Sequence, residues 1–197
     1  MKQAQINPRK TPKQARAKAS VQAILQAVAH ILERGGLETL TTNYVAEVAG
    51  VSIGTLYQYY PSKEAILTDI IRQKRARLLE DLQAATLAMR NESFDATLAK
   101  LLRAAVESQL HWPKLSKALE YAESFLPLEQ ETRVLNEQIN QTIVAFLEHH
   151  QVACAPVAAR DLVSALRGMI DGAGLAGETD AQALFERALR LARGYLA

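Results

Sequence analysis

The sequence contains few of the residues that bring disulfide bonds, metals or membranes into a protein. Its 197 residues include a single cysteine, Cys154, which excludes an internal disulfide framework and a cysteine-based metal cluster. His149 and His150 add too few ligands for a metal site and are expected at the surface, with Cys154 as a small hydrophobic residue. No apolar run approaches the roughly 18 residues that span a bilayer, and the first eighteen residues lack a signal-peptide core. A cytoplasmic protein is expected.

Recognisable catalytic motifs are absent as well. We find no Ser-His-Asp set, no paired carboxylate motif, no glycine-rich phosphate loop and no metal-ligand spacing. The sequence therefore favours a protein that is not an enzyme and uses no cofactor. Two alternatives stay open. One is an enzyme whose active site is a cavity in the C-terminal part, and the other is a helical adaptor whose N-terminal part binds protein.

Charge is divided unevenly along the chain, although the formal net charge is only +2. Residues 1–63 hold eight Lys/Arg against three Glu, whereas residues 64–197 hold fifteen basic against eighteen acidic residues. A basic front on an acidic body suggests a polyanionic partner for the front only. Because 49% of the residues are apolar, the chain can also bury a substantial core.

The apolar residues repeat with the period of α-helices. From Ala17 onward they recur at three- and four-residue steps as far as Gly35-Gly36, which predicts a first amphipathic helix. After residue 64 the pattern stays helical, and no segment alternates like a half-buried strand. Breaks divide this part into segments of helical length near Asn91, Pro113, Pro127, Pro156 and residues 178–180. We therefore expect an all-α fold with about nine helices.

Two short helices are expected between the first helix and a long fourth one. Thr41, Ser52 and Ser62 can each cap a helix start, Gly50 can turn the chain, and Pro61 closes the third helix. The residues expected to face inward are Val45, Ala46, Val48 and Ala49 in the first short helix and Leu56 and Tyr60 in the second. Two short helices joined in this way have the form of a helix-turn-helix.

The second short helix combines small residues with polar-tipped aromatic ones. Its outward faces carry Ser52, Ile53, Gly54, Thr55, Tyr57 and Tyr59. Small residues allow a helix to approach a surface closely, and the hydroxyl groups can donate to phosphate oxygens, with Lys63 adding a charge-assisted contact. Packing accounts for Tyr60 and partly for Tyr44, but not for the remaining tyrosines beside glycine and threonine. Contact with DNA is therefore the favoured interpretation.

The same region contains five short motifs in a fixed order: Thr41-Thr42-Asn43, Val45-Ala46, Ala49-Gly50-Val51-Ser52, Gly54-Thr55-Leu56-Tyr57 and Ser62-Lys63-Glu64-Ala65-Ile66-Leu67. With these motifs the chain resembles the tetracycline-repressor (TetR/AcrR) family over about residues 20–70. The resemblance implies a homodimeric, ligand-responsive transcriptional repressor that binds a palindromic operator in double-stranded DNA. It also implies three regions: a flexible basic tail at 1–16, a helix-turn-helix DNA-binding domain at 17–63, and a helical ligand-binding and dimerisation domain at 64–197.

Positions in the family motif assign roles to individual residues. Thr42 and Asn43 are expected at the DNA edge of the second helix. The residues expected to face bases or phosphates are Ser52, Ile53, Gly54 and Thr55, and those expected to hold the backbone are Tyr57, Tyr59 and Lys63. Many family members have His-Phe where this chain has Tyr59-Tyr60.

The reading segment holds no Arg, Asn or Gln before Gln58, so it offers few bidentate contacts to base edges. We expect specificity to depend on Asn43, on contact between Ile53 and a thymine methyl group, and on DNA shape. The basic tail with Arg9-Lys10, Lys13, Arg16 and Lys18 has two interpretations. It is either an arm that contacts DNA or a solvated, disordered terminus.

The resemblance places the effector pocket and the dimer surface in the C-terminal part. An unknown, largely apolar small molecule is expected there. Candidate pocket residues are bulky or polar groups on inward helix faces: Met89, Leu102, His111, Trp112, Tyr121, Phe125, Ile143 and Phe146. Ordinary core packing is the alternative for each of them.

The last two predicted helices suit a dimer surface. Gly168, Gly172 and Ala176 follow one another at four-residue spacing, which permits close approach between helices. The final helix has a broad apolar stripe, and the dimer residues expected from it are Leu184, Ala188, Leu191 and Tyr195. Two such helices from each subunit could form a four-helix bundle across a two-fold axis.

Overall fold

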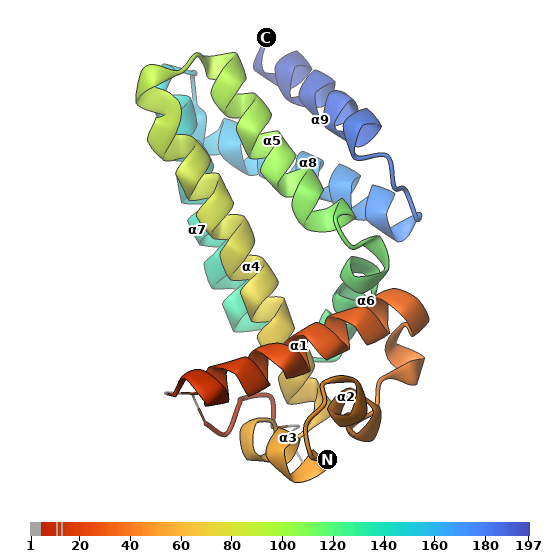
Figure 1. The fold of residues 1–197 in the computed structure, drawn as a ribbon. Coiled ribbons are helices and arrows are strands. Elements are labelled where there is room, and N and C mark those ends of the chain that lie inside the picture. The colour runs from red at the N-terminus through yellow and green to blue at the C-terminus, as the bar shows by residue number, and fades with distance from the viewer. Residues whose placement is uncertain (1–4, 11, 13) are drawn as a thin grey trace. The chain divides into compact units, whose positions relative to one another are not determined.

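The structure is a computed structural model and describes residues 5–10, 12 and 14–197. Every regular element in these ranges is a helix, which confirms the predicted all-α class (Figure 1). The α-helices are α1 (Ala15–Gly35), α2 (Thr42–Val48), α3 (Ile53–Tyr59), α4 (Lys63–Leu87), α5 (Phe94–Leu110), α6 (Pro113–Glu123), α7 (Glu129–His149), α8 (Ala155–Leu175) and α9 (Ala181–Leu196). Short 3-10 turns, η1 (Leu37–Thr39) and η2 (Ala88–Asn91), complete the set. None of the described helices is both long and apolar enough to cross a bilayer.

The chain forms two compact units, each built from two segments. Unit 1 comprises the chain up to Gln73 together with Lys114–Pro127, and unit 2 comprises Lys74–Pro113 together with Leu128–Ala197. The division predicted at residues 63 and 64 stays a prediction. Within the predicted tail, residues 1–4, 11 and 13 lie outside the described residues, and Lys13 is among them.

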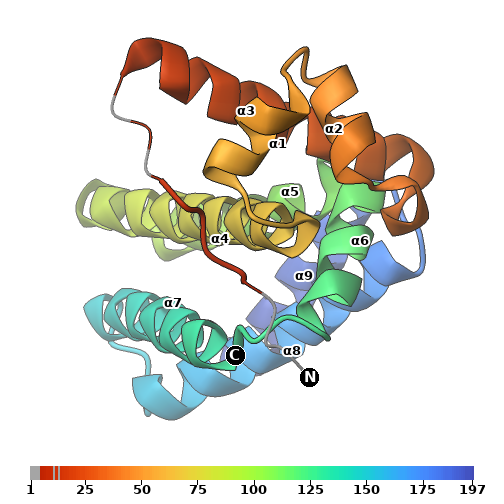
Figure 2. The same ribbon diagram turned by 90° about the horizontal axis from the view of Figure 1, so that it is seen from below.

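Unit 1 is centred on α1, which packs against α2, while α2 packs against α3 (Figure 2). Because α2 and α3 have only seven residues each, neither would be stable alone, and burial holds them in place. The fully or nearly fully buried side chains are Ile24, Val28, Ile31, Leu32, Val45, Leu56, Ala65, Ile66, Leu67 and Ile71. The inward position predicted for Val48 is wrong, because its side chain is 43% exposed.

The helix ends in unit 1 follow the predicted local chemistry. The hydroxyl oxygen of Thr41 accepts from the Tyr44 amide at 3.2 Å, that of Ser52 from the Thr55 amide at 3.0 Å, and that of Ser62 from the Ala65 amide at 3.2 Å. Gly50 has a φ of +65°, where glycine avoids the steric cost that other residues carry. These caps confirm that Thr41, Ser52 and Ser62 begin their helices.

A carboxylate from α1 fixes the start of α6 within unit 1. Oε2 of Glu33 accepts from the backbone amide of Leu115 at 2.8 Å. The first amides of a helix have no partner inside it, so a carboxylate at this position satisfies one of them and meets the positive end of the helix dipole. The second segment of unit 1 is thereby tied to α1.

A buried hydrogen bond joins the end of α3 to α4. Tyr60 is 1% exposed, and its hydroxyl group donates to Oδ2 of Asp69 at 2.5 Å. Burial, followed by this hydrogen bond and the charge of Asp69, raises the pKa of Tyr60 far above its ordinary value. The tyrosine therefore stays protonated and keeps donating at any physiological pH.

Substitution of Tyr60 by phenylalanine is expected to destabilise the protein by about 1–3 kcal/mol. The ring remains, but the partly buried Asp69 carboxylate loses its donor. Urea denaturation followed by circular dichroism measures the change. Tyr59→Phe is the matched control and should stay within about 0.5 kcal/mol. Equal urea midpoints for Tyr60→Phe and the unmodified protein would contradict the role of the hydrogen bond.

Unit 2 packs α5, α7, α8 and α9 around one apolar core that includes the second half of α4 (Figure 1). The core contains Leu82, Leu102, Val106, Phe146, Leu147, Ala159, Leu162, Leu184 and Ala188. Gly174 of α8 lies close to the side chain of Gln109 of α5. A Cβ atom on Gly174 would lie 2.7 Å from Nε2 of the buried Gln109, so any larger residue would displace that side chain.

Candidate nucleic-acid interface

The two short helices α2 and α3, with the turn between them, expose a set of small, polar and apolar side chains. Asn43, Ser52, Ile53, Gly54 and Tyr57 are exposed. The other predicted contacts within the two helices, Thr42, Thr55 and Tyr59, are half-buried, and Lys63 is exposed as the first residue of α4. All nine predicted DNA-contacting residues therefore lie in unit 1 with at least part of their surface open to solvent.

Hydrogen bonds between side chains fix several of these groups. The Thr42 hydroxyl group and the Tyr57 hydroxyl group lie 3.0 Å apart, which joins the start of α2 to the face of α3. Ser52 and Thr55 pair through their hydroxyl groups at 2.8 Å, next to the capping bond that Ser52 already makes. A hydroxyl group held in this way loses little rotational entropy when a phosphate oxygen replaces or joins its partner.

Gly54 stands in open space at the start of α3. A Cβ atom built on it would meet only Oγ of Ser52, at the ordinary contact distance of 3.8 Å. Among the described residues, therefore, nothing requires glycine here, since its backbone also has no positive φ. The absence of a side chain leaves the first turn of α3 free to approach another surface closely.

Two apolar residues outside the predicted set are also exposed on α2. Tyr44 is 45% exposed and Val48 is 43% exposed on α2, values close to the 39% of both Ile53 and Tyr57. Part of Tyr44 was expected to pack inward, and Val48 entirely so. The length of α2 could have indicated this exposure. A helix of seven residues buries one narrow face, and Val45 and Ala46 already fill that face.

The predicted effector residues fall into three groups. Leu102 and Phe146 are buried in the core of unit 2, and Met89 and Ile143 pack against the same core. His111 and Trp112 follow the end of α5, with ring centroids 6.3 Å apart. Tyr121 and Phe125 belong to unit 1, where both rings are more than half exposed and meet edge to face at 5.9 Å. The structure brings only the first group into one core, and the pocket stays a prediction.

An aromatic cluster in unit 2 involves a histidine that was expected at the surface. The His150 ring meets those of Phe146 and Phe94 at 5.2 and 5.3 Å, and its Nε2 atom is buried without a hydrogen-bond partner. Burial, with a smaller contribution from His149, lowers the pKa of His150 and keeps it neutral among these rings. His150 is therefore half-buried and not a plain surface residue, because its ring packs edge-on against the stacked rings of Phe94 and Phe146.

Cys154 also departs from expectation, since it is exposed and precedes α8 with a φ of +51°. Because Cys154 is exposed, the role predicted for it as a small hydrophobic residue is wrong. Within the described residues, no three His, Cys, Asp or Glu side chains gather in a way that could hold a metal ion.

The predicted dimer residues divide between surface and core. Gly168, Gly172 and Ala176 are exposed on α8 and at its end. On α9, Tyr195 is exposed and Leu191 half-buried. Leu184 and Ala188 instead have no exposed surface, because they fill the core of unit 2 itself, and we leave them out of the dimer surface.

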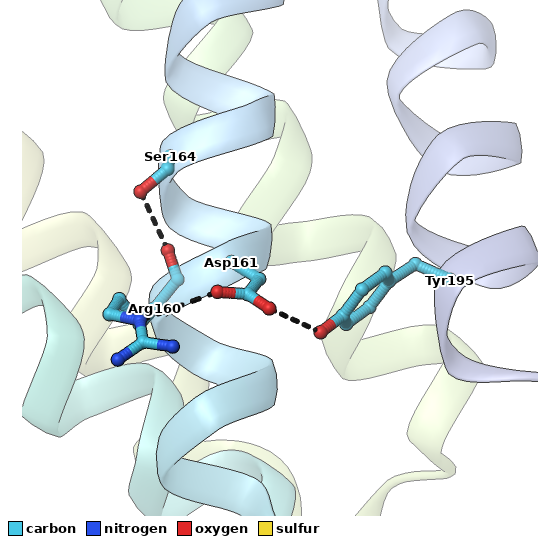
Figure 3. Close-up of polar contacts among 4 residues, drawn as sticks. All are labelled: Arg160, Asp161, Ser164 and Tyr195. Carbon is cyan, nitrogen blue, oxygen red and sulfur yellow. Dashed lines mark hydrogen bonds and ion pairs between the residues drawn. The ribbon is translucent and has the colours of Figure 1, made fainter.

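Figure 3 shows how α8 and α9 are joined next to this surface. The Tyr195 hydroxyl group donates to Oδ2 of Asp161 at 2.8 Å, and the Arg160 guanidinium lies 3.3 Å from the other carboxylate oxygen. The hydrogen bond to Asp161 raises the pKa of Tyr195 above its ordinary value of 10.0. The bond holds the exposed tyrosine ring against α8.

A known family model matches the sequence of the N-terminal helices. The sequence model described as "Bacterial regulatory proteins, tetR family" matches residues 24–70, which run from within α1 to within α4. The HTH-type transcriptional repressor KstR of Mycolicibacterium smegmatis is 31% identical over 103 residues, which are 51% of this chain and 50% of the relative. This chain thus spans about half the length of the first curated relatives that it matches. The HTH-type transcriptional regulator BetI of Burkholderia thailandensis is 26% identical over 88% of this chain and 89% of the relative.

Solved structures share the fold over most of the chain. A transcriptional regulator from Cytophaga hutchinsonii superposes with a TM-score of 0.74 at 18% identity, over 90% of this chain and 97% of the other. A TetR transcription regulator from Haloarcula marismortui gives 0.69 at 21% identity, over 91% and 97%. Each of these names is that of a regulator of transcription and not of an enzyme.

Proposed function

We propose that this chain is a sequence-specific transcriptional repressor of the TetR family, which binds DNA through the helix-turn-helix in the matched region. The observation that carries the proposal is the exposed surface of α2 and α3, where hydroxyl groups, a glycine and Ile53 stand together within the matched region. We further propose that it acts in the cytoplasm as a homodimer whose DNA affinity is controlled by a small molecule.

In the proposed complex, α3 lies in the major groove. Gly54 brings the helix close to the base edges, and Ile53 contacts a thymine methyl group. Tyr57, Tyr59 and Lys63 bind backbone phosphates, while Thr42 holds the Tyr57 hydroxyl group in position at 3.0 Å. Asn43 at the start of α2 supplies an amide that can reach a phosphate or a base edge. Because few charged groups take part, the shape of the DNA contributes to specificity.

The proposed dimer surface comprises the exposed residues of α8 and α9. A Cβ atom added to Gly168 or Gly172 would have no neighbouring side chain within 4 Å, so the backbone of a second α8 could approach closely. Leu191 and the ring of Tyr195 would flank that contact. A dimer that binds a palindromic operator presents two α3 helices, whose spacing must match successive major grooves about 34 Å apart.

The proposed effector site is the apolar core of unit 2 around Leu102, Ile143 and Phe146. An unidentified, largely apolar molecule would bind best to one arrangement of the helices in this unit. If that arrangement gives an α3 spacing that does not fit the operator, the ligand lowers the affinity for DNA. Because the coupling is reciprocal, bound DNA lowers the affinity for the ligand by the same factor.

A mobility-shift assay with DNA from upstream of the gene tests the proposal. We expect a sequence-specific complex that weakens as salt increases. Lys63→Ala should weaken binding to all DNA about equally and reduce the salt slope by about 1. Ile53→Ala should instead reduce the free-energy preference for the base pair that it contacts by about 1 kcal/mol. Arg77→Ala removes an exposed cation outside the helix-turn-helix and serves as the control. Binding that ignores sequence would rule out a specific repressor.

A further inference from the structure

The carboxyl end of α3 leaves backbone carbonyl groups without partners inside the helix. The last four carbonyls of any helix lack an intrahelical donor, and the negative end of the helix dipole lies there. The Leu56 carbonyl is satisfied directly, by the amide of Tyr60. The last turn of α3 contains no basic residue, and Pro61 prevents the helix from continuing. The end of α3 can therefore accept hydrogen bonds from water or from donors elsewhere in the chain.

Arg9 supplies two of these donors from a distant part of the sequence. Its backbone amide donates to the Tyr59 carbonyl at 2.7 Å, and its guanidinium Nη1 donates to the Tyr57 carbonyl at 3.2 Å. The positive charge of the side chain also meets the negative end of the helix dipole. One residue thus caps α3 as a C-terminal arginine within the helix would.

Further hydrogen bonds hold residues 5–10, the N-terminal arm, along the start of α4 (Figure 2). The Ser62 hydroxyl group donates to the Gln5 carbonyl at 3.2 Å, while the same oxygen caps α4. Nη2 of Arg72 donates to Oδ1 of Asn7 at 3.0 Å. These two bonds attach the arm to α4 and to the residue that caps it. Because Arg9 follows directly, its guanidinium stays at the end of α3.

We propose that Arg9 is a positioning residue for DNA reading, which fixes the carboxyl end of α3 and thereby sets the angle at which the helix presents Ile53, Gly54 and Tyr57. The inference rests on the proposed function for its consequence but not for its geometry. It differs from both interpretations of the basic tail, since Arg9 acts on the protein's own backbone. A capped seven-residue helix keeps one orientation, whereas an uncapped one frays from its last turn.

The test compares Arg9→Ala with Lys10→Ala, which removes the neighbouring exposed charge. In the DNA-free protein, Arg9→Ala should speed hydrogen exchange of the amides at 57–60 by about 3- to 10-fold, and Lys10→Ala should not. On DNA, Arg9→Ala should reduce the ratio of operator to non-specific affinity by about 10-fold with an unchanged salt slope. Arg9→Lys retains the charge and one donor and should recover most of both effects.

Two results would overturn the inference. If Arg9→Ala and Lys10→Ala weaken operator and non-specific DNA alike and each lowers the salt slope by about 1, Arg9 is a phosphate contact. If exchange at 57–60 is unaffected by Arg9→Ala, the Arg9 side chain does not stabilise the end of α3, and the proposed positioning role is wrong. Should the unmodified protein bind no operator, the proposed function fails, but faster exchange in Arg9→Ala alone would still establish the cap.

Discussion

Replacing Gly54 with glutamate is expected to abolish operator binding while the protein remains folded. The site is exposed, and a Cβ atom there meets only Ser52 at 3.8 Å, so the free protein has room for a longer side chain. A carboxylate in the first turn also interacts favourably with the helix dipole. On DNA, the same side chain would separate α3 from the groove and place a negative charge beside phosphates.

We expect the affinity for the operator to fall by more than about 100-fold, because several contacts to base edges worth about 1–3 kcal/mol each are lost together. Fluorescence anisotropy with a labelled operator measures the loss, and circular dichroism checks the fold. Gly54→Gln separates bulk from charge, and Gly54→Ala should cost far less than either. Retained binding by Gly54→Glu would show that α3 does not approach DNA through this turn.

Truncating Phe146 to alanine is expected to cost about 3–5 kcal/mol of unfolding free energy, the largest stability effect of any substitution considered. The ring is 1% exposed, stacks on Phe94 at a centroid distance of 5.0 Å and meets His150. Its removal leaves a cavity that helices on both sides cannot close without moving. Since a domain has only about 5–15 kcal/mol in total, the variant should be barely stable.

Urea denaturation of Phe146→Ala gives the measurement, and Tyr121→Ala is the control. The control also removes an aromatic ring, but that ring is 67% exposed, so its loss should change stability by no more than about 0.5 kcal/mol. A cost below about 1 kcal/mol for Phe146→Ala would mean that the ring borders an open pocket, and would strengthen its predicted place in the effector site.

The parts of the fold that could be predicted from the sequence are those set by neighbouring residues. A hydroxyl oxygen three residues before an amide caps a helix wherever the chain allows it, so Thr41, Ser52 and Ser62 were identified correctly. Gly50 and the burial of Leu56 and Tyr60 follow from equally local patterns. Helical period likewise indicated the all-α class.

The contacts that escaped prediction join residues far apart in the chain. Arg9 meets Tyr57 across 48 residues, and Glu33 meets Leu115 across 82. Local periodicity does not predict either pair. The Arg9 and Glu33 side chains look like ordinary surface residues in the sequence, and only the fold places each beside a helix end with unpaired backbone groups. The same limitation explains Leu184 and Ala188, whose apolar stripe gives no sign of whether its partner is the same chain or another.

In the candidate interface, local chemistry predicted the exposure of the polar groups better than that of the apolar ones. The hydroxyl groups of α3 were placed by their position after the turn. Tyr44 and Val48 were missed because hydrophobic residues are expected inside, while a short helix can bury only part of them. Whether a residue of such a helix is exposed therefore depends on the length of the helix as much as on the residue type.

The two-segment composition of unit 1 bears on how such a protein can change in evolution. The helix-turn-helix occupies one continuous stretch, yet α6 returns to the same unit after the Lys74–Pro113 segment and is fastened by Glu33 to the amide of Leu115. A single recombination event near residue 73 would transfer the helix-turn-helix with α1 but leave behind the helix that Glu33 caps. A chimera joined at that point would therefore keep the hydrogen bond from Glu33 only if the α6 of the other protein began at the same place.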